Sequence, residues 1–259
     1  MRRVVFNQKG GVGKSSIAAN LAAISASRGI STLLVDLDPQ GNASQYLLGA
    51  DYEACDRGIG DFFEDCLSFR LLEQEPARYI EETGFEDLDL IPSSPDLNEL
   101  EAKLQAKHKI YKFRELMDDV SAQYQAVYID TPPAFNFFTL SALIAAQGCL
   151  IPFDCDDFSR RALYQLLENV EETRSDHNRE LHVEGIVINQ FLPRANLPRR
   201  LVEELCQEGL PVLQTRLSSS VKMRESHDRA MPLIYLAPRH KLTTEFVALF
   251  EELAATPVR

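Results

Sequence analysis

The chain has 259 residues, 45% of them hydrophobic, and a formal net charge of −12 at pH 7. This composition is typical of a globular domain and argues against a protein coated in basic charge for nucleic acid. Its five cysteines form no CxxC pair, and no apolar run approaches the roughly 18 residues of a membrane span. We therefore expect a cytoplasmic protein with free thiols.

Short apolar runs alternate along the chain with stretches of helical period. Ile17, Leu21 and Ile24, for example, recur at the spacing of one helix face. Nearly continuous apolar strands separated by helices predict an α/β fold, a doubly wound and mostly parallel sheet flanked by helices. No linker or repeat interrupts the pattern, so we predict a single domain over residues 1–259. The predicted strands are 4–6, 32–35, 88–91, 126–129, 149–151 and 185–188.

The first predicted strand leads into a glycine-rich segment, QKGGVGKSS, at residues 8–16. A strand, a glycine-rich turn and a helix start are how a phosphate-binding loop is built, because successive backbone N–H groups then face one concavity. Lys14 can reach the terminal phosphates, and Ser15 can offer its hydroxyl to Mg²⁺. The nucleotide-binding residues that we predict in this loop are Gly10, Gly11, Val12, Gly13, Lys14, Ser15 and Ser16.

This loop departs from the general motif at its start, where Gln8 replaces a glycine and a second lysine, Lys9, follows. The loop already wraps its own phosphates, so Lys9 is poorly placed to curl back onto them. It can instead point outward, toward a nucleotide held by another copy of the chain.

Acidic residues follow two other predicted strands. Asp36 and Asp38 end the strand at 32–35, and Asp130 ends the strand at 126–129. Because the carboxyl ends of parallel strands meet at one edge of a sheet, all three can face the phosphates held by Lys14. We expect Asp130, with Ser15, to hold Mg²⁺, Asp38 to orient a water in line with the γ-phosphate, and Asp36 to support Mg²⁺ or the loop. The turns at 37–43 and 131–136 are candidate switches.

The rest of the chain is less informative. Residues 49–84 show no clear strand and predict a helical excursion without an assigned role. From Gly185 to Lys241 there are nine Lys and Arg residues against five Asp and Glu, a local balance of +4. The predicted last helix, 243–254, has one apolar face and an acidic polar face, so we expect it to dock onto the domain rather than onto a membrane.

Three of these segments resemble motifs of one family. Residues 9–15 (KGGVGKS), 35–42 (VDLDPQGN) and 128–133 (YIDTPP) resemble the deviant Walker A, A′ and Walker B motifs of the ParA/MinD family of ATPases. The similarity extends to residues 187–189 and to the loop around 216–225. It covers most of the chain outside residues 49–84.

The resemblance implies a P-loop NTPase fold and a set of roles. ATP with Mg²⁺ would drive a sandwich homodimer in which Lys9 contacts the partner's nucleotide. Lys9, Lys14 and Asp38 would be the catalytic residues, with Asp38 positioning the water, and Asn189 would contact the adenine. Hydrolysis would be weak until a ParB-like or other adaptor protein stimulates it.

Within that family the chain is most similar to the ParA-like branch, because its acidic end lacks the basic amphipathic helix of MinD-like members. That branch holds non-specific DNA with basic residues of its C-terminal part, which implies association with the nucleoid in the ATP state and no membrane partner. Here Lys222 stands where the branch commonly has an arginine. The candidate DNA-binding residues are Arg194, Arg199, Arg200, Arg216, Lys222 and Arg224.

Such a cycle positions or segregates a cargo, which would be a plasmid, a chromosome or a protein assembly. Two alternatives stay open. One is a P-loop ligase or synthase of the dethiobiotin-synthetase type, which uses the same loop to phosphorylate a small carboxylate. The other is a nucleotide-gated scaffold whose hydrolysis is vestigial. A second basic cluster, at Lys103, Lys107, His108, Lys109 and Lys112, is interpreted as a solvated helix face.

Overall fold

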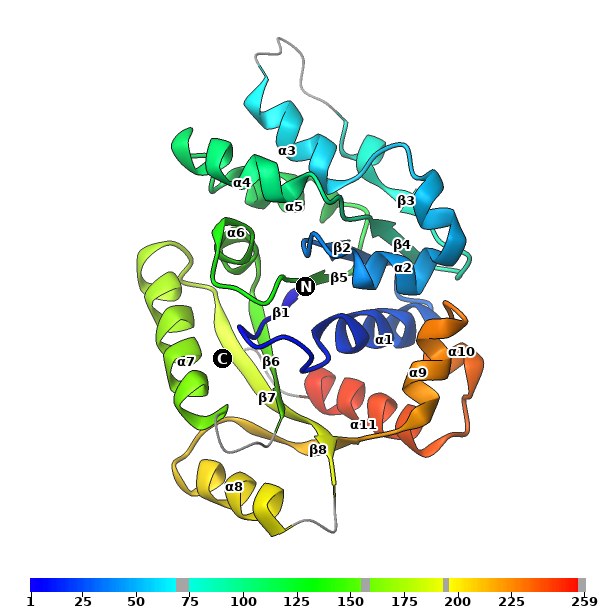
Figure 1. Cartoon of the computed structure of the whole chain (residues 1–259), viewed down its shortest axis with the longest axis vertical. Coiled ribbons are helices and arrows are strands. Elements are labelled where there is room, and N and C mark those ends of the chain that lie inside the picture. Colours follow the sequence, from blue (N-terminus) through cyan, green and yellow to red (C-terminus); the bar gives the residue numbers. More distant parts are fainter. Residues whose placement is uncertain (69–74, 155–158, 193–195, 256–259) are drawn as a thin grey trace.

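The computed structural model describes residues 1–68, 75–154, 159–192 and 196–255. Within these ranges the strands form one eight-stranded sheet in the order β3-β4-β2-β5-β1-β6-β7-β8 (Figure 1). Neighbouring strands run parallel, except for the antiparallel pair β3 and β4. The predicted α/β fold class is thereby confirmed. The strands are β1 (Arg2–Val5), β2 (Thr32–Asp36), β3 (Glu81–Glu82), β4 (Leu88–Ile91), β5 (Ala126–Asp130), β6 (Gly148–Asp154), β7 (His182–Phe191) and β8 (Val212–Ser218).

Helices cover both faces of this sheet (Figure 1), and each face has its own apolar cluster. Helices α3 to α8 pack on one face, and α1, α2, α10 and α11 pack on the other. The α-helices are α1 (Lys14–Ser27), α2 (Asn42–Leu48), α3 (Ile59–Leu67), α4 (Leu97–Ala106), α5 (Lys112–Val120), α6 (Phe137–Ala145), α7 (Ser159–Asp176), α8 (Asn196–Gln207), α9 (Val221–Asp228), α10 (Leu233–Leu236) and α11 (Lys241–Ala255). Two 3₁₀ turns, η1 (Gly49–Ala54) and η2 (Pro76–Tyr79), lie in the helical excursion expected at 49–84.

The central strands end together, which is what positions the site. Val5 and Asp36 are both in register with Asp130, so β1, β2 and β5 finish at the same level of the sheet. The glycine-rich loop leaves β1 at this level, between the acidic ends of its neighbours.

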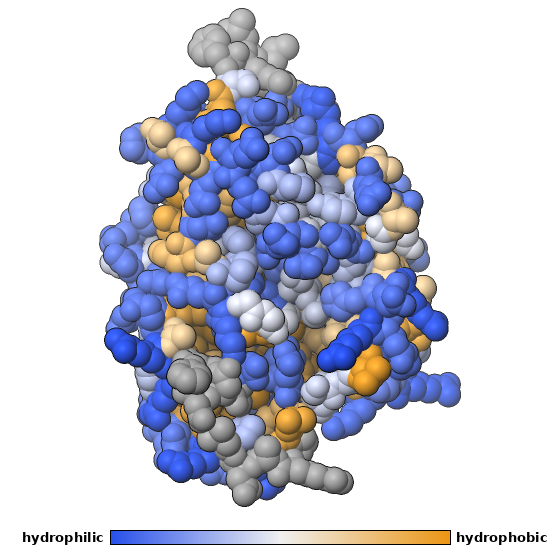
Figure 2. Space-filling model, in the orientation of Figure 1, coloured by the Kyte–Doolittle hydropathy of each residue, from blue (hydrophilic) through white to orange (hydrophobic). Residues whose placement is uncertain are grey.

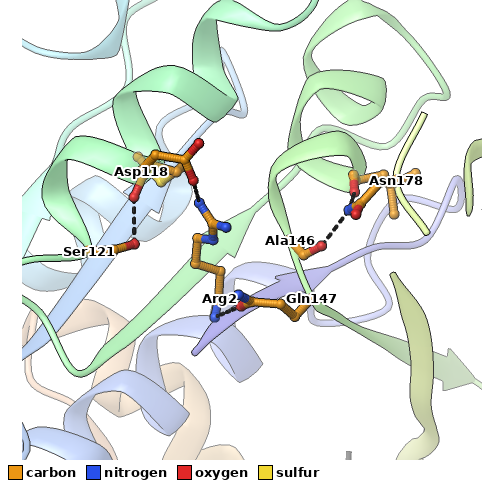
Figure 3. Close-up of polar contacts among 8 residues, drawn as sticks. Arg2, Asp118, Ser121, Ala146, Gln147 and Asn178 are labelled. Atoms are coloured by element: carbon orange, nitrogen blue, oxygen red, sulfur yellow. Dashed lines mark hydrogen bonds and ion pairs between the residues drawn. The ribbon is translucent and has the colours of Figure 1, made fainter. Parts of the chain in front are cut away.

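Polar contacts fix the opposite edge of the sheet, where β1 begins (Figure 3). Arg2 forms an ion pair with Asp118, and its backbone N–H donates to Gln147 Oε1 at 2.6 Å. Asn178 Nδ2 donates to the carbonyl oxygen of Ala146 at 2.6 Å. At the end of the sheet that lies away from the glycine-rich loop, Arg2 thus ties β1 to α5 and to the turn before β6, and Asn178 holds that turn.

A buried ion pair lies beside this edge. The guanidinium of Arg3 bonds both carboxylate oxygens of Glu184, and its Nη1 donates to the hydroxyl of Tyr128 at 3.3 Å. Arg3 and Glu184 are each less than 10% exposed. Because both charges are buried, removing either one would leave the other buried without a partner and would destabilise the fold.

The last helix, α11, docks as predicted, through Phe246, Leu249 and Leu253 on its buried face. Two of its acidic residues form hydrogen bonds with β8 that the sequence does not predict. Glu252 accepts hydrogen bonds from the backbone N–H groups of Gln214 (2.7 Å) and Thr215 (2.9 Å) in β8, and Glu245 accepts one from Ser218 (2.8 Å). Carboxylates of α11 thus accept hydrogen bonds from backbone N–H groups of β8, the outermost strand at this side of the sheet.

The surface is mainly polar on the face shown in Figure 2, where hydrophobic residues emerge in small separate groups. Among the described helices, none has the length and the continuous hydrophobicity that crossing a bilayer requires.

Candidate functional site

The glycine-rich loop connects β1 to α1 and requires glycine at its end. Gly13 precedes the helix with φ = +88°, a left-handed conformation that L-residues disfavour. A Cβ placed there would lie 2.3 Å from Nδ2 of Asn189, which itself donates to the carbonyl oxygen of Val12 at 2.8 Å. The end of β7 therefore packs directly against the loop.

Lys14 lies under this loop and is only 6% exposed. Its Nζ donates to the carbonyl oxygen of Lys9 at 3.4 Å. Burial lowers the pKa of the ammonium group, while the charges of Asp130 and Asp38 oppose that change. A lysine so enclosed is a cation held in place for an anion that enters the loop.

Asp130 is fully buried at the end of β5, and the arrangement around it suits Mg²⁺ bound through phosphates. Its Oδ1 accepts the N–H of Thr131 at 3.1 Å, whereas its Oδ2 is buried without a hydrogen-bond partner. Burial raises the pKa of this carboxyl, as does the charge of Asp36, and the hydroxyl of Ser15 and the charge of Lys14 lower it. Mg²⁺ is commonly held by one or two protein oxygens plus substrate phosphates, and Ser15 with Asp130 fits that donor set.

Asp36 lies at the end of β2 and organises the next loop. Its Oδ2 accepts the N–H (2.9 Å) and the hydroxyl (2.7 Å) of Ser44, and its Oδ1 accepts the N–H of Asp38 (3.1 Å). Burial raises the pKa of Asp36 to about 6, although the bonds from Ser44 and Asp38 lower it. These contacts use the carboxylate to hold the segment from Asp38 to Ser44, whereas the role expected for Asp36 at Mg²⁺ or the phosphate loop stays a prediction.

Asp38 sits on that loop with 5% of its surface exposed. Its Oδ1 accepts the N–H of Gln40 at 3.0 Å, and its carbonyl oxygen accepts the hydroxyl of Ser93 at 2.5 Å. Ser93 also donates its N–H to the hydroxyl oxygen of Ser44 at 3.0 Å. The loop that carries Asp38 is therefore fastened to both β2 and the segment after β4.

Lys9 does not line the cavity described next. Its side chain is 40% exposed, and its Nζ is 3.7 Å from Asp154 Oδ2 at the end of β6. It lines a small depression with Asn7, Val12 and Asp154. Lys9 and Lys14, five residues apart, thus face different surroundings.

A cavity of about 210 Å³ opens beside the loop, between the ends of β7 and β8 and helix α9. Asn189, expected to contact the adenine, lines it, and Gln190 Nε2 closes one side by donating to the carbonyl oxygen of Gly11 at 2.9 Å. The cavity is also lined by Gln190, Ser219, Met223 and Phe246, none of which was predicted as a site residue. Of these four, only Gln190 has a sequence signal, because it closely follows the predicted strand at 185–188; Met223 and Phe246 lie within helices α9 and α11.

The candidate DNA-binding residues do not form one patch. Arg199 and Arg200 lie on α8, whereas Lys222 and Arg224 lie on α9, and the two helices are well separated in Figure 1. The guanidinium of Arg216 stacks over the ring of Phe191 at 4.7 Å. Arg194 lies outside the described residues.

Two of the candidate DNA-binding residues form ion pairs with carboxylates, and a third lines the cavity. Arg200 Nε pairs with Glu204 at 2.8 Å, and Lys222 pairs with Glu225. Arg224 is exposed and lines the cavity beside the phosphate loop. In the second basic cluster, Lys107 Nζ donates to the carbonyl oxygen of Leu67 at 3.0 Å.

The fold and the site together define a P-loop nucleotide-binding protein. A model of the AAA domain family matches residues 3–183. The chain is 33% identical over 253 residues to the chromosome partitioning protein ParA of Myxococcus xanthus, covering 96% of this chain and 86% of the relative. It is 31% identical to the sporulation initiation inhibitor protein Soj of Bacillus subtilis, covering 97% of each.

Solved structures agree on the architecture. A structure described as cobyrinic acid a,c-diamide synthase from Mycobacterium smegmatis with bound ATP analogue and magnesium has a TM-score of 0.76 and 26% identity, covering 92% of this chain and 96% of that one. The Cyanothece McdA structure, at 20% identity, shares the fold with a TM-score of 0.84 over 97% of this chain and 98% of that one. The chain belongs to the ParA/MinD family of P-loop partition and positioning ATPases.

Proposed function

We propose that this protein is a nucleotide-driven dimer switch that binds DNA without sequence specificity and positions a cargo. The observation that carries the proposal is the placement of its two loop lysines. Lys14 is buried under the phosphate loop, while Lys9 is 40% exposed and lies away from the cavity of its own chain. A lysine so placed can reach a nucleotide in a second copy that faces it.

Within each copy, residues 10–16 would hold the phosphates of ATP and Ser15 with Asp130 would hold Mg²⁺. When bound, Mg²⁺ supplies charge neutralisation at the terminal phosphates. Lys14 contributes a fixed positive charge, and Asp38, held by its contacts with Gln40 and Ser93, orients the attacking water. Asn189 contacts the base from the cavity wall. An adaptor protein would speed the slow basal hydrolysis and so reset the switch.

DNA binding would use the half-buried Lys222 and the exposed Arg224 of α9, repeated in the two copies of a dimer. Lys222 already pairs with Glu225 within its helix, so a DNA phosphate must compete with that carboxylate. The contribution of each lysine is therefore modest, and a dimer that doubles the contacts gains most. This gives a physical reason for DNA affinity to follow dimerisation.

The decisive experiment measures the mass in solution with ATP and Mg²⁺, using light scattering after size exclusion. The parent is Asp38→Ala, which we expect to bind ATP without hydrolysing it and to form a dimer. Adding Lys9→Ala should leave a monomer that still binds ATP. The matched control, Lys103→Ala on the exposed face of α4, should dimerise like the parent. A Lys9→Ala protein that dimerises normally would refute the proposal.

DNA binding needs its own measurement. Lys222→Gln should weaken the affinity of the ATP-bound Asp38→Ala protein for duplexes of any sequence, and log affinity should fall with log salt by roughly 0.9 per phosphate contacted. Lys103→Gln serves as the control. If Lys103→Gln weakens binding and Lys222→Gln does not, the DNA surface is the cluster on α4 and the assignment to α9 is wrong.

The synthase alternative draws support from the Mycobacterium smegmatis structure, which is described as a synthase. The partition proteins nevertheless match at higher identity over nearly the whole chain. A synthase would release ADP rapidly when given a small carboxylate substrate, without DNA or an adaptor. A partition ATPase would respond to DNA and an adaptor instead, and steady-state ADP release distinguishes the two.

A further inference from the structure

One histidine connects the phosphate loop to helix α9. His227 Nε2 lies 2.8 Å from the hydroxyl oxygen of Ser16, at the start of α1. The two residues are far apart in the sequence, and the roles expected from the sequence leave His227 unused. This hydrogen bond joins a residue of the nucleotide site to the helix that carries Lys222 and Arg224.

The same imidazole also contacts the helix that follows the Asp38 loop. Its ring stacks on Tyr46 of α2, with the centroids 4.0 Å apart and the planes 19° apart. The Tyr46 hydroxyl is hydrogen-bonded to Ser226, the neighbour of His227, and accepts a bond from Asn20 of α1 at 3.0 Å. Helices α1, α2 and α9 thus meet at one stacked and hydrogen-bonded cluster.

The chemistry of Ser16 makes this contact sensitive to what the loop holds. A serine hydroxyl has a single proton to donate. Without a phosphate, Ser16 can give that proton to an unprotonated Nε2 of His227. If a phosphate oxygen takes the proton, the serine oxygen is left as an acceptor, and the imidazole must present Nε2–H. The direction of the hydrogen bond would then depend on the occupancy of the loop.

Burial favours the neutral imidazole that such an exchange requires, because it lowers the pKa of His227. Ser226 restricts the response further, since its hydroxyl donates to the carbonyl oxygen of Met231 at 2.6 Å and so fixes the end of α9. Asn20 reinforces the joint by accepting the N–H of Leu233 at 2.9 Å. A change at Ser16 therefore reaches α9 where Ser226, its one buried residue, and the following segment are held by hydrogen bonds.

We propose that His227 is a positioning residue that transmits the occupancy of the phosphate loop to α9, through Ser16 on one side and the stack on Tyr46 on the other. The consequence for DNA rests on the function proposed above, because it requires that Lys222 or Arg224 contact DNA. The transmission itself does not require it, since α9 would respond to nucleotide whatever it binds.

The test compares backbone amide hydrogen exchange with and without a non-hydrolysable ATP analogue and Mg²⁺. In the native protein the analogue should slow exchange both in residues 10–16 and in residues 221–228. His227→Phe keeps an aromatic ring for Tyr46 and removes the hydrogen bond, so it should retain the effect in the loop and lose it in α9. If the analogue slows exchange in α9 equally in His227→Phe, the proposal is wrong.

Two further variants separate transmission from mere folding. His227→Gln retains a side chain that can donate to Ser16, and it should restore part of the response of α9. Ser16→Ala, alone or combined with His227→Phe, should give the same loss of response as His227→Phe alone, because all remove one shared bond. Losses that add in the double variant would assign His227 a structural role only and overturn the proposal.

A DNA measurement completes the design. The ratio of DNA affinity with the ATP analogue to that with ADP should fall roughly tenfold in His227→Phe, within the usual range for coupled sites. If Lys222→Gln and Arg224→Gln both leave DNA affinity unchanged while α9 still responds through His227, the DNA assignment fails and the transmission stands. If Lys222→Gln weakens DNA binding but α9 responds without His227, the transmission fails and the DNA assignment stands.

Discussion

Replacing Gly13 with alanine tests the packing of the phosphate loop against β7. The new Cβ would lie 2.3 Å from Asn189 Nδ2, so the asparagine must move and give up its bond to the carbonyl oxygen of Val12. A left-handed conformation costs an L-residue roughly 1–2 kcal/mol. The lost hydrogen bond adds roughly 0.5–1.5 kcal/mol. We expect Gly13→Ala to lower the free energy of unfolding by about 1.5–3.5 kcal/mol in total.

Gly29 offers a matched control for this substitution. Its φ is +72°, and a Cβ there meets nothing within 4 Å. Gly29→Ala should therefore cost the conformational part alone, roughly 1–2 kcal/mol. Combining Gly13→Ala with Asn189→Ala should likewise reduce the cost of the Gly13 change to that part, because the collision is gone.

Equilibrium urea unfolding measures these costs, and calorimetric titration measures ATP binding alongside them. Gly13→Ala should also weaken ATP binding, since it displaces the residue expected to contact the adenine. Gly29→Ala should not. Equal unfolding costs for Gly13→Ala and Gly29→Ala would refute the claim that the end of β7 packs against the loop.

Other perturbations address the two buried charge clusters. The pKa of Asp36 is raised to about 6, whereas the usual value for an aspartate is near 4. Between these pH values the folded protein therefore binds more protons than the unfolded chain. Because of this difference, the free energy of unfolding falls as the pH rises from about 4 to about 6. Ser44→Ala removes a hydrogen bond to the Asp36 carboxylate, so it should raise the pKa of Asp36 further and destabilise the fold by about 2 kcal/mol. Carboxyl NMR titration measures the pKa, and urea unfolding measures the stability. An unchanged pKa would contradict the role given to Ser44. Glu184→Ala should cost about 3–5 kcal/mol by leaving Arg3 buried without its partner. Glu251→Ala, at an exposed pair, should cost under about 0.5 kcal/mol, and similar losses for the two would contradict this reasoning.

Strand prediction succeeded where apolar residues are continuous. The predicted strand at 88–91 coincides with β4, and all six predicted runs lie wholly or largely within strands of the sheet. The strand β8 was missed because Gln214, Thr215 and Arg216 interrupt its apolar pattern, as befits an edge strand with one side open to water. The two-residue β3, made of glutamates, has no apolar signal at all.

The candidate site likewise has parts that the sequence predicts and parts that it does not. Lys14, Asp36 and Asp130 could be grouped from the sequence because parallel strands carry their ends to one edge. The contact of Ser16 with His227 could not, because a lone histidine in a helix gives no spacing signal and its partner is distant in the chain. The local charge of +4 could not show where the basic residues lie, because Arg199 and Arg200 are on α8 whereas Lys222 and Arg224 are on α9. The net charge of a sequence segment therefore does not show that its basic residues share one surface.

The carboxylates of α11 on β8 have a consequence for how molecules of this protein can meet. An open strand edge is a template on which another chain can extend the sheet, and repeated extension produces fibres. Glu245 and Glu252 already occupy amide groups of β8, and the opposite edge strand, β3, is only two residues long and presents Glu81 and Glu82. Both ends of the sheet thereby resist edge-to-edge aggregation, even where many copies crowd together.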